Sequence, residues 1–496
     1  MNSKKMETWS RRKDIISDLP EALICHILSF LSTKEAALTS LLSKKWRYLF
    51  AAKPNLDFDD SECSRPELVN QLETNEVHIA FMRFVTRVLA SQGDSTIRSF
   101  SLKCGHGIYP VFVCRWISNV MLRGISDLDL RVTVDWKNLM MPARVFMSKS
   151  LVRLRIETGN GTMIGGMHME HVFLPKLKTL YLDLITFGFG DGDNYLVKLI
   201  SACPVLEELV MINLSWDGYW HRSVSSKTLK RLTLRCQDYD QNPDSVTFDT
   251  PNLVYFEYSD HVAQKYDIVK FDSLVEASIG LRMTRDQQTL ASYGDLVGNA
   301  TDPLTRICNV QILYLYASTL EALTFCCKPI PVFKKLIHLT VKTHRQAGWE
   351  SLPALLKKCP SLETLVFEGL HHKKTVKCED GDGCLCKSSE VDIRSCLSSS
   401  PVKVLKILKF GEISFYCDDT EKEKQKQMEQ VKYFLETMPK LEQMIVCYNT
   451  RIDEDLKSQL ERLVPRGASS KCSIQLICDH VLAPVYPYSG VIDYLE

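Results

Sequence analysis

The stretch LISACPVLEELVM, residues 199–211, decides how most of this chain folds. An apolar pair of helical character ends just before the proline, and a proline moves the residue before it away from the helical conformation. A leucine follows, and Leu209 and Met211 then stand two residues apart, so they share one face of a short strand. The same order of residue types occurs in LLKKCPSLETLVF at 355–367 and in FLETMPKLEQMIV at 434–446. The three copies predict a repeated unit of helix, turn and strand.

A looser form of this spacing recurs along the chain: an apolar residue, two others, an apolar residue, one other, an apolar residue. Copies begin at Leu151, Leu177, Leu206, Leu229, Leu336, Leu362 and Leu441, with less regular ones at Leu253 and Leu274. Most successive starts lie about 21 to 29 residues apart, which is the period of leucine-rich repeats. One unit cannot bury the apolar face of its strand, whereas a stack of units can. Longer gaps after Leu274 and Leu362 predict insertions or loops.

A different pattern fills residues 16–50, ISDLPEALICHILSFLSTKEAALTSLLSKKWRYLF. Ser17 or Asp18 is expected to cap a first helix, with Pro20 in its first turn. A single apolar stripe at helical spacing follows, made of Leu23, Ile24, Ile27, Leu28 and Leu31. The pattern predicts an amphipathic helix that needs burial against a partner surface.

Two further short helices are expected behind it. Ser32 and Glu35 have the spacing of a capping box for a second helix through Leu42. A third helix begins near Lys44 and carries Trp46. Three helices of this size expose more apolar area than they can hide from water, because so small a segment has too little interior of its own. They form either a docking module for another protein or a helical cap on the repeats.

The helical segment resembles an F-box, on its leading Leu-Pro pair, its apolar ladder and its SLLSKKWRYL close, and the repeats resemble those of plant F-box proteins. The resemblance implies that the segment binds the Skp-type adaptor of SCF cullin–RING ubiquitin ligases, and through it cullin. The residues it places on the adaptor-facing surface are Leu19, Pro20, Leu23, Ile27, Leu28 and Leu31. Trp46 would lock the third helix. The alternative remains that these are core residues of a helical cap on the repeats, buried by this chain itself.

The segment at 398–449 resembles the FBD domain found at the C-terminus of many plant F-box proteins with leucine-rich repeats. Residues 421–438 predict a charged helix, with Asp418 and Asp419 suited to its N-terminal end. Its apolar residues at helical spacing are Met428, Val431, Leu435 and Met438. CSIQLICD at 472–479 predicts one more strand.

The composition is that of an ordinary globular protein, with 45% hydrophobic and 24% charged residues in a chain of 496. A net charge of +1 gives no reason to expect nucleic acid or an anionic membrane as a partner. There is no secretory signal pattern and no apolar run of about 18 residues, so no membrane span is expected. The 18 cysteines are scattered among apolar neighbours, which is typical of core thiols in a reducing compartment. We therefore expect an intracellular protein, cytoplasmic, nuclear or both.

No pattern of a catalytic site is found: HExxH, GxSxG and the phosphate-binding GxxxxGK motif are all missing, so neither catalytic residues nor a cofactor are expected. Four cysteines share one segment without the paired spacing of a zinc site: Cys378, Cys384, Cys386 and Cys396. No metal is expected there, nor at GFGDGDN, residues 188–194, which lacks the spacing of a calcium loop. Three aromatic residues could anchor a partner or pack on the scaffold: Trp216, Tyr219 and Trp220.

Together these patterns predict an α/β protein with a short three-helix F-box, a curved leucine-rich-repeat solenoid and an FBD segment that continues the stack. The expected boundaries are 11–58, 90–397 and 398–480. The expected function is that of a non-catalytic substrate-recognition subunit of an SCF-type ubiquitin ligase, whose repeats bind a target protein for ubiquitination. The alternative is an adaptor-binding repeat scaffold that acts without ubiquitin transfer. Strand positions expected to face the target include Tyr181, Glu208, Arg231 and Glu363.

Overall fold

The structure is a computed structural model of the whole chain. It describes residues 16, 18–63, 71–93, 95–133, 141–163, 172–186, 195–214, 221–236, 241–269, 271–293, 297–373, 397–412, 420–448, 452, 454–463 and 472–478. The chain divides into two compact units, Met1–Leu206 and Glu207–Glu496, called here the N-terminal and the C-terminal unit.

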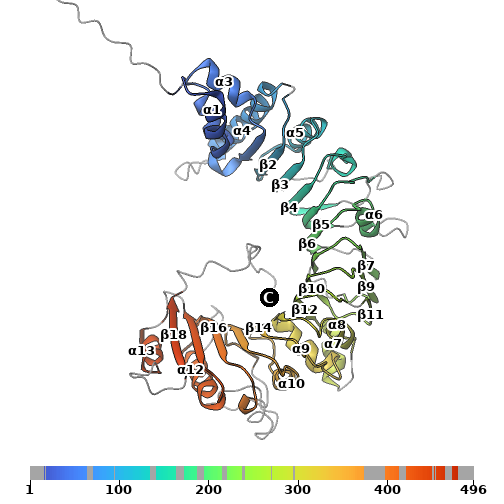
Figure 1. Cartoon of the computed structure of the whole chain (residues 1–496), viewed down its shortest axis with the longest axis vertical. Helices are drawn as coiled ribbons and strands as arrows, with labels where there is room; N and C mark the ends of the chain where they lie inside the picture. The colour runs from blue at the N-terminus through green and yellow to red at the C-terminus, as the bar shows by residue number, and fades with distance from the viewer. Residues whose placement is uncertain are drawn as a thin grey trace, which may run out of the picture. The chain divides into compact units, whose positions relative to one another are not determined.

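The N-terminal unit begins with short helices and continues with parallel strands. Its helical segments are α1 (Glu21–Phe30), α2 (Thr33–Thr39), α3 (Lys44–Ala51), the 3-10 turn η1 (Asp60–Cys63), α4 (Gln71–Ser91), α5 (Pro110–Leu122), η2 (Ala143–Met147) and α6 (Tyr195–Ser201). Its strands are β1 (Asn55–Asp59), β2 (Ser99–Cys104), β3 (Asp127–Val132), β4 (Arg153–Met163) and β5 (Thr179–Thr186). Figure 1 shows these strands following one another in chain order, and each pairs in parallel with the next.

The register of the N-terminal unit carries one apolar row from strand to strand. Phe58 on β1 lies opposite Leu102, and Leu102 lies opposite Leu130. Ile156 and Leu182 continue the row on β4 and β5. All five side chains are buried, so they form the interior side of the sheet, and the residues between them lie on its other face. The predicted repeat spacing is confirmed here.

The C-terminal unit contains the longer run of strands. Its helices are α7 (Arg285–Ser292), α8 (Thr301–Arg306), α9 (Ala317–Cys326), α10 (Leu352–Lys357), α12 (Thr420–Thr437) and α13 (Glu454–Leu463). The strands of its main sheet are β6 (Glu208–Leu214), β8 (Arg231–Cys236), β10 (Tyr255–His261), β12 (Glu276–Arg282), β13 (Ile312–Leu315), β14 (His338–Lys342), β15 (Thr364–Glu368), β16 (Val404–Phe410), β17 (Gln443–Tyr448) and β18 (Ser473–Cys478). They pair in parallel in this order.

The repeats between β6 and β12 differ from the predicted unit. Here β7 (His221–Ser225), β9 (Ser245–Asp249) and β11 (Lys265–Ile268) form a second parallel sheet in the order β11-β9-β7, which Figure 1 shows beside β10 and β12. Buried and less buried residues alternate along each of these strands, which is the period of a strand and not of a helix. The expectation of a helix in every unit was wrong in these repeats, because the leucine spacing marks only the first strand of each unit.

The long gap after Leu274 contains two helices, α7 and α8, ahead of β13. Thr284 and Gln287 form a capping box that begins α7, with the Gln287 amide donating to Thr284 Oγ1 at 3.2 Å. The predicted insertion is therefore an ordered part of the C-terminal unit.

The FBD segment continues the main sheet, as expected. Strands β16, β17 and β18 follow β15 in parallel register. Helix α12 has nearly the predicted bounds, and Leu435 is only partly buried, since the neighbouring Phe434 takes the interior position. The buried apolar side chains of α12 and of the residue that follows it are Met428, Val431, Phe434 and Met438. Asp418 and Asp419 lie outside the described residues.

Candidate protein-docking surface

Helices α2 and α3 begin at side-chain caps. Ser32 Oγ accepts a hydrogen bond from the Glu35 amide at 3.2 Å, and the Glu35 carboxylate accepts one from the Ser32 amide at 2.9 Å. The predicted capping box is thereby confirmed. Ser43 begins α3 by accepting a hydrogen bond from the Trp46 amide at 3.3 Å.

Helix α1 begins differently from the sequence prediction. It starts at Glu21 with Pro20 at the N-cap, and no side chain caps it. Pro20 therefore occupies the N-cap position that was expected for Ser17 or Asp18, and Ser17 itself lies outside the described residues. The Pro20 carbonyl instead accepts hydrogen bonds from two amides of the first turn, at 3.0 and 3.2 Å.

The three helices share a small apolar interior. Its buried side chains are Ile24, Leu28, Ala36, Trp46, Leu49 and Phe50. Trp46 lies in this interior on α3, whereas Leu28, which the resemblance placed on the adaptor-facing surface, is only 2% exposed. Ile24 and Leu28 stand four residues apart on one row of α1, and that row faces inward. Leu28 therefore does not belong to the exposed surface.

A second set of large apolar side chains on the same segment stays in contact with solvent. Its members are Ile16, Leu23, Ile27, Phe30, Leu38, Leu41, Leu42 and Tyr48, which we call the apolar face. Leu23 is 50% exposed and Phe30 is 76% exposed. Soluble proteins rarely leave so much apolar surface in one place unless another molecule covers it. Such a surface is typical of a site that binds another protein.

The remaining predicted residues lie around this face. Pro20 is exposed, and Leu19 and Leu31 are partly exposed. Leu41 and Leu42 were not predicted to belong to the surface; they lie in the turn after α2, which ends at Thr39. The sequence signal that could have identified them as surface residues is a pair of adjacent leucines among polar residues.

Polar contacts fix the helices to one another and to the first strand. Lys53 is 5% exposed, and its Nζ donates to the carbonyls of Leu28 at 2.8 Å and Leu31 at 2.9 Å. The Asp57 carboxylate on β1 accepts from both the amide and the hydroxyl of Thr33, at 3.0 and 2.8 Å. The three-helix segment is thus hydrogen-bonded directly to β1, the first strand of the sheet.

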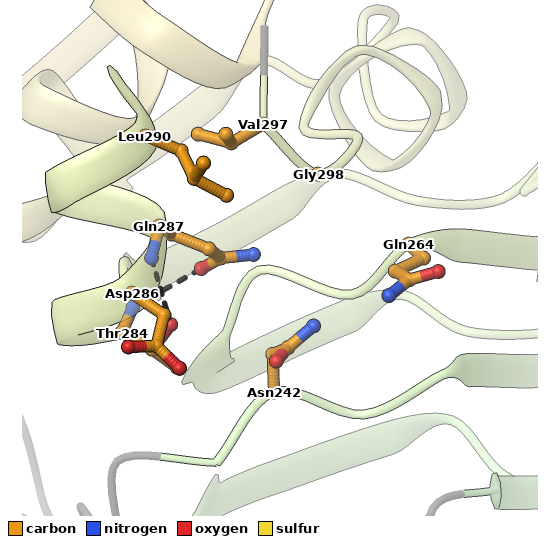
Figure 2. A pocket seen from close by; sticks show the side chains of 8 residues that line it. All are labelled: Asn242, Gln264, Thr284, Asp286, Gln287, Leu290, Val297 and Gly298. Atoms are coloured by element: carbon orange, nitrogen blue, oxygen red, sulfur yellow. Dashed lines mark hydrogen bonds between the residues drawn. The ribbon is translucent and has the colours of Figure 1, made fainter. Parts of the chain in front are cut away.

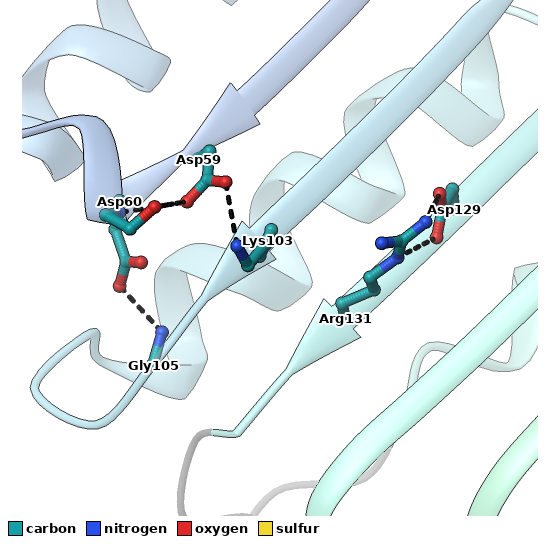
Figure 3. A network of polar contacts seen from close by, with 7 residues as sticks. Asp59, Asp60, Lys103, Gly105, Asp129 and Arg131 are labelled. Carbon is teal, nitrogen blue, oxygen red and sulfur yellow. Dashed lines mark hydrogen bonds and ion pairs between the residues drawn. The ribbon is translucent and has the colours of Figure 1, made fainter. Parts of the chain in front are cut away.

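The other face of the N-terminal sheet carries a network of ion pairs, shown in part in Figure 3. Lys103 Nζ lies 3.0 Å from the Asp59 carboxylate, and Arg131 lies 3.2 Å from Asp129. Asp60 accepts a hydrogen bond from the Gly105 amide at 2.7 Å. These pairs are largely exposed, so each contributes at most about 1 kcal/mol to stability, and they leave the face polar.

The predicted target-facing positions are not equally accessible. Arg231 is exposed and Glu208 is partly exposed. Glu363 precedes β15 and pairs with Lys403 at 3.1 Å. Tyr181 lies on the outward face of β5, between the interior Leu180 and Leu182, but it is only 7% exposed and so is not accessible to a target. The Arg155 guanidinium covers the Tyr181 ring at 3.8 Å from its centre, and burial raises the pKa of Tyr181 to about 12.

One recess of about 350 Å³ lies in the C-terminal unit beside the start of α7 (Figure 2). Its lining residues are Asn242, Gln264, Thr284, Asp286, Gln287, Leu290, Val297 and Gly298. The Gln287 side chain is already bonded, since it accepts from the Thr284 amide at 3.1 Å and donates to the Val262 carbonyl at 3.0 Å. Among the described residues of the lining, Asp286 is the one charged group, so these residues offer no acid–base pair.

The other sites considered in the sequence give no chemical centre in the described part of the chain. There, no group of three or more His, Cys, Asp or Glu side chains could hold a metal ion. Burial raises the pKa of Cys203 and of Cys359 to about 12, so both thiols stay protonated and pack as small apolar groups. The four-cysteine segment, the aromatic residues at 216–220 and GFGDGDN all lie outside the described residues.

Three short helices with an exposed apolar face, followed by parallel strands at the leucine-rich-repeat period, define an F-box protein with leucine-rich repeats. The F-box domain family matches residues 16–57. The family described as "FBD-associated F-box protein At5g56370, LRR repeats" matches residues 113–269.

Full-length relatives from Arabidopsis thaliana are similar over nearly the whole chain. "Putative F-box/FBD/LRR-repeat protein At3g59240" is 66% identical over 478 residues, covering 96% of this chain and 92% of the relative. "F-box/LRR-repeat protein At3g59250" is 56% identical over 472 residues, covering 94% and 98%. The chain belongs to the plant F-box/FBD/leucine-rich-repeat family. Within the described residues, none of the helices has the length and apolar character to cross a membrane.

Proposed function

We propose that this protein is a substrate-recognition subunit of an SCF-type ubiquitin ligase. The F-box docks to a Skp-type adaptor and through it to cullin, and the repeats bind a target protein. The observation that carries the proposal is the apolar face on α1 to α3, with Leu23 and Ile27 exposed while Ile24 and Leu28 of the same helix are buried. Covering such side chains is worth about 25 cal/mol for each Å² removed from water.

The proposed role needs no catalytic side chain. Holding a target beside a ubiquitin-conjugating enzyme raises the effective concentration of its lysines, which accelerates transfer by proximity alone. The proposal includes the domain boundaries 11–58, 90–397 and 398–480 and an intracellular location, cytoplasmic or nuclear. Buried thiols such as those of Cys203, Cys326 and Cys359 support that location, because disulfides are rare in reducing compartments.

A charge placed on the apolar face tests the adaptor contact. We expect the double substitution Leu23→Asp/Ile27→Asp to abolish co-purification of the adaptor with the full chain, since two carboxylates would have to be desolvated in the interface. The matched control is Leu122→Asp/Leu290→Asp, which changes two exposed leucines elsewhere and should leave adaptor capture unchanged.

Two outcomes would contradict the proposal. Retained adaptor capture by the Leu23/Ile27 variant would refute the assignment of the face. Capture of adaptor without cullin, in the same pull-down, would favour a repeat scaffold that acts without ubiquitin transfer.

A further inference from the structure

We propose that the non-helical face of the C-terminal main sheet, between β12 and β16, binds an acidic extended segment of the target protein, an inference that rests on the proposed function. The face is the side opposite the buried Leu313 and Leu315. We call it the recognition face; the residues that define it are Arg282, Tyr314, Tyr316, Lys342, Glu368 and Lys406.

Within the described part of the chain, the positive charges at the two ends of this face form no ion pair with a carboxylate. The Arg282 guanidinium donates to Ser259 Oγ at 3.0 Å and to the Cys236 carbonyl at 2.9 Å, which are both neutral groups. Lys406 on β16 makes no hydrogen bond or ion pair with the described residues, and its charge, together with burial, lowers the pKa of His338. Both cations can therefore attract an anionic partner.

The carboxylates near these cations are already engaged. Glu257 pairs with Arg235 at 2.6 Å and accepts a hydrogen bond from the Tyr255 hydroxyl at 2.8 Å. Glu368 pairs with Lys409 at 2.7 Å. Glu276 lies at the opposite end of β12, six residues and about 20 Å from Arg282. The charge available to a partner on the recognition face is positive.

The spacing of the two cations sets the length of the occupant. Lys406 is in register with Ser278, four strands away, and Arg282 stands four residues further along β12. At about 4.8 Å between strands and about 3.3 Å for each residue, the two positions lie about 23 Å apart. An extended peptide spans that distance in about seven residues.

Two tyrosines form a fixed platform between the cations. Tyr314 and Tyr316 pack edge to face with centres 5.1 Å apart. Their hydroxyls donate to Glu368 at 2.6 Å and to Glu257 at 3.1 Å. Tyr316 lies so close to Gly280 that a Cβ there would be 3.1 Å from the ring. Rigid tyrosines lose little entropy on binding, so an apolar middle with acidic ends is the segment that fits.

A random 12-residue peptide library displayed on phage, selected against the full chain, tests this inference. We expect enriched peptides to carry Asp or Glu about seven residues apart. A labelled synthetic peptide of the enriched sequence should bind Arg282→Glu and Lys406→Glu each at least fivefold more weakly, because attraction becomes repulsion. Lys406 makes no hydrogen bond or ion pair with the described residues, so weaker peptide binding by Lys406→Glu would not reflect misfolding. The control is Lys335→Glu or Lys432→Glu, which alters an exposed lysine elsewhere in the same unit and should change binding little.

The inference is overturned if no peptide is enriched, if enriched peptides lack excess acidic residues, or if the control variants lose binding equally. It is also overturned if single-stranded 12-nucleotide DNA binds as tightly as the acidic peptide. The adaptor-face variant Leu23→Asp/Ile27→Asp should select the same peptides. If the unmodified chain failed to bind adaptor but still selected acidic peptides, the proposed function alone would be contradicted. If the unmodified chain bound adaptor but selected no acidic peptides, this inference alone would be contradicted.

Discussion

Glu368 shows how a single partly buried carboxylate contributes to the C-terminal unit. Burial by itself would raise its pKa, but Lys409 at 2.7 Å and the Tyr314 hydroxyl at 2.6 Å outweigh burial and hold the pKa below the ordinary 4.5. Because the folded pKa is the lower one, this contribution is complete above pH 4.5 and is lost as the pH falls through the folded pKa.

We therefore expect Glu368→Gln to lower the free energy of unfolding by about 1–3 kcal/mol at pH 7. The variant should also lose stability less steeply than the parent protein between about pH 5 and pH 3. Urea unfolding at a series of pH values measures both effects. Glu363→Gln removes a largely exposed pair with Lys403 and should cost less than about 1 kcal/mol; an equal cost for both would contradict the account.

The sequence predicts at the residue scale which positions are apolar, but not which of them the chain itself covers. Leu23 and Ile27 form one row of α1 and Ile24 and Leu28 the next, and all four are apolar. Only packing against Trp46 and its neighbours decides that the second row is buried. The low accessibility of Tyr181 was not predictable for a similar reason, because a side chain on the neighbouring strand covers its ring.

At the scale of elements, Lys53 holds the end of α1 in place. Its Nζ satisfies two carbonyls that a helix end otherwise leaves without partners. We expect Lys53→Met to destabilise the F-box by about 1–3 kcal/mol, since both carbonyls would then be buried without a donor. Hydrogen exchange of the α1 and α3 amides measures this directly. The exposed Lys44→Met is the control, and equal exchange in the two variants would contradict the role of Lys53.

The repeats were predictable because burial imposes a fixed spacing on the leucines of each strand. The FBD segment was predictable for the same reason, since its strands and α12 follow the same period. The second sheet was not predictable from that spacing. Strands such as β7 and β9 are five residues long and carry only two apolar residues or fewer each, and their pairing joins segments about 24 residues apart.

At the scale of the whole molecule, the two proposed binding surfaces lie in different units. The N-terminal unit carries the apolar face, and the C-terminal unit carries the recognition face. The sequence predicts the adaptor as partner because an F-box has a recognisable residue pattern. It does not identify the target, because the residues that face a target vary without changing the buried period of the repeats.

The central claim is that the apolar face is completed by a second protein. Calorimetric titration of a Skp-type adaptor into the full chain, repeated at several temperatures, tests it most directly. We predict 1:1 binding with a negative change in heat capacity, which is the signature of apolar burial, and loss of that signal in Leu23→Asp/Ile27→Asp. Absence of binding, or binding whose heat capacity change is the same in the variant, would contradict the account.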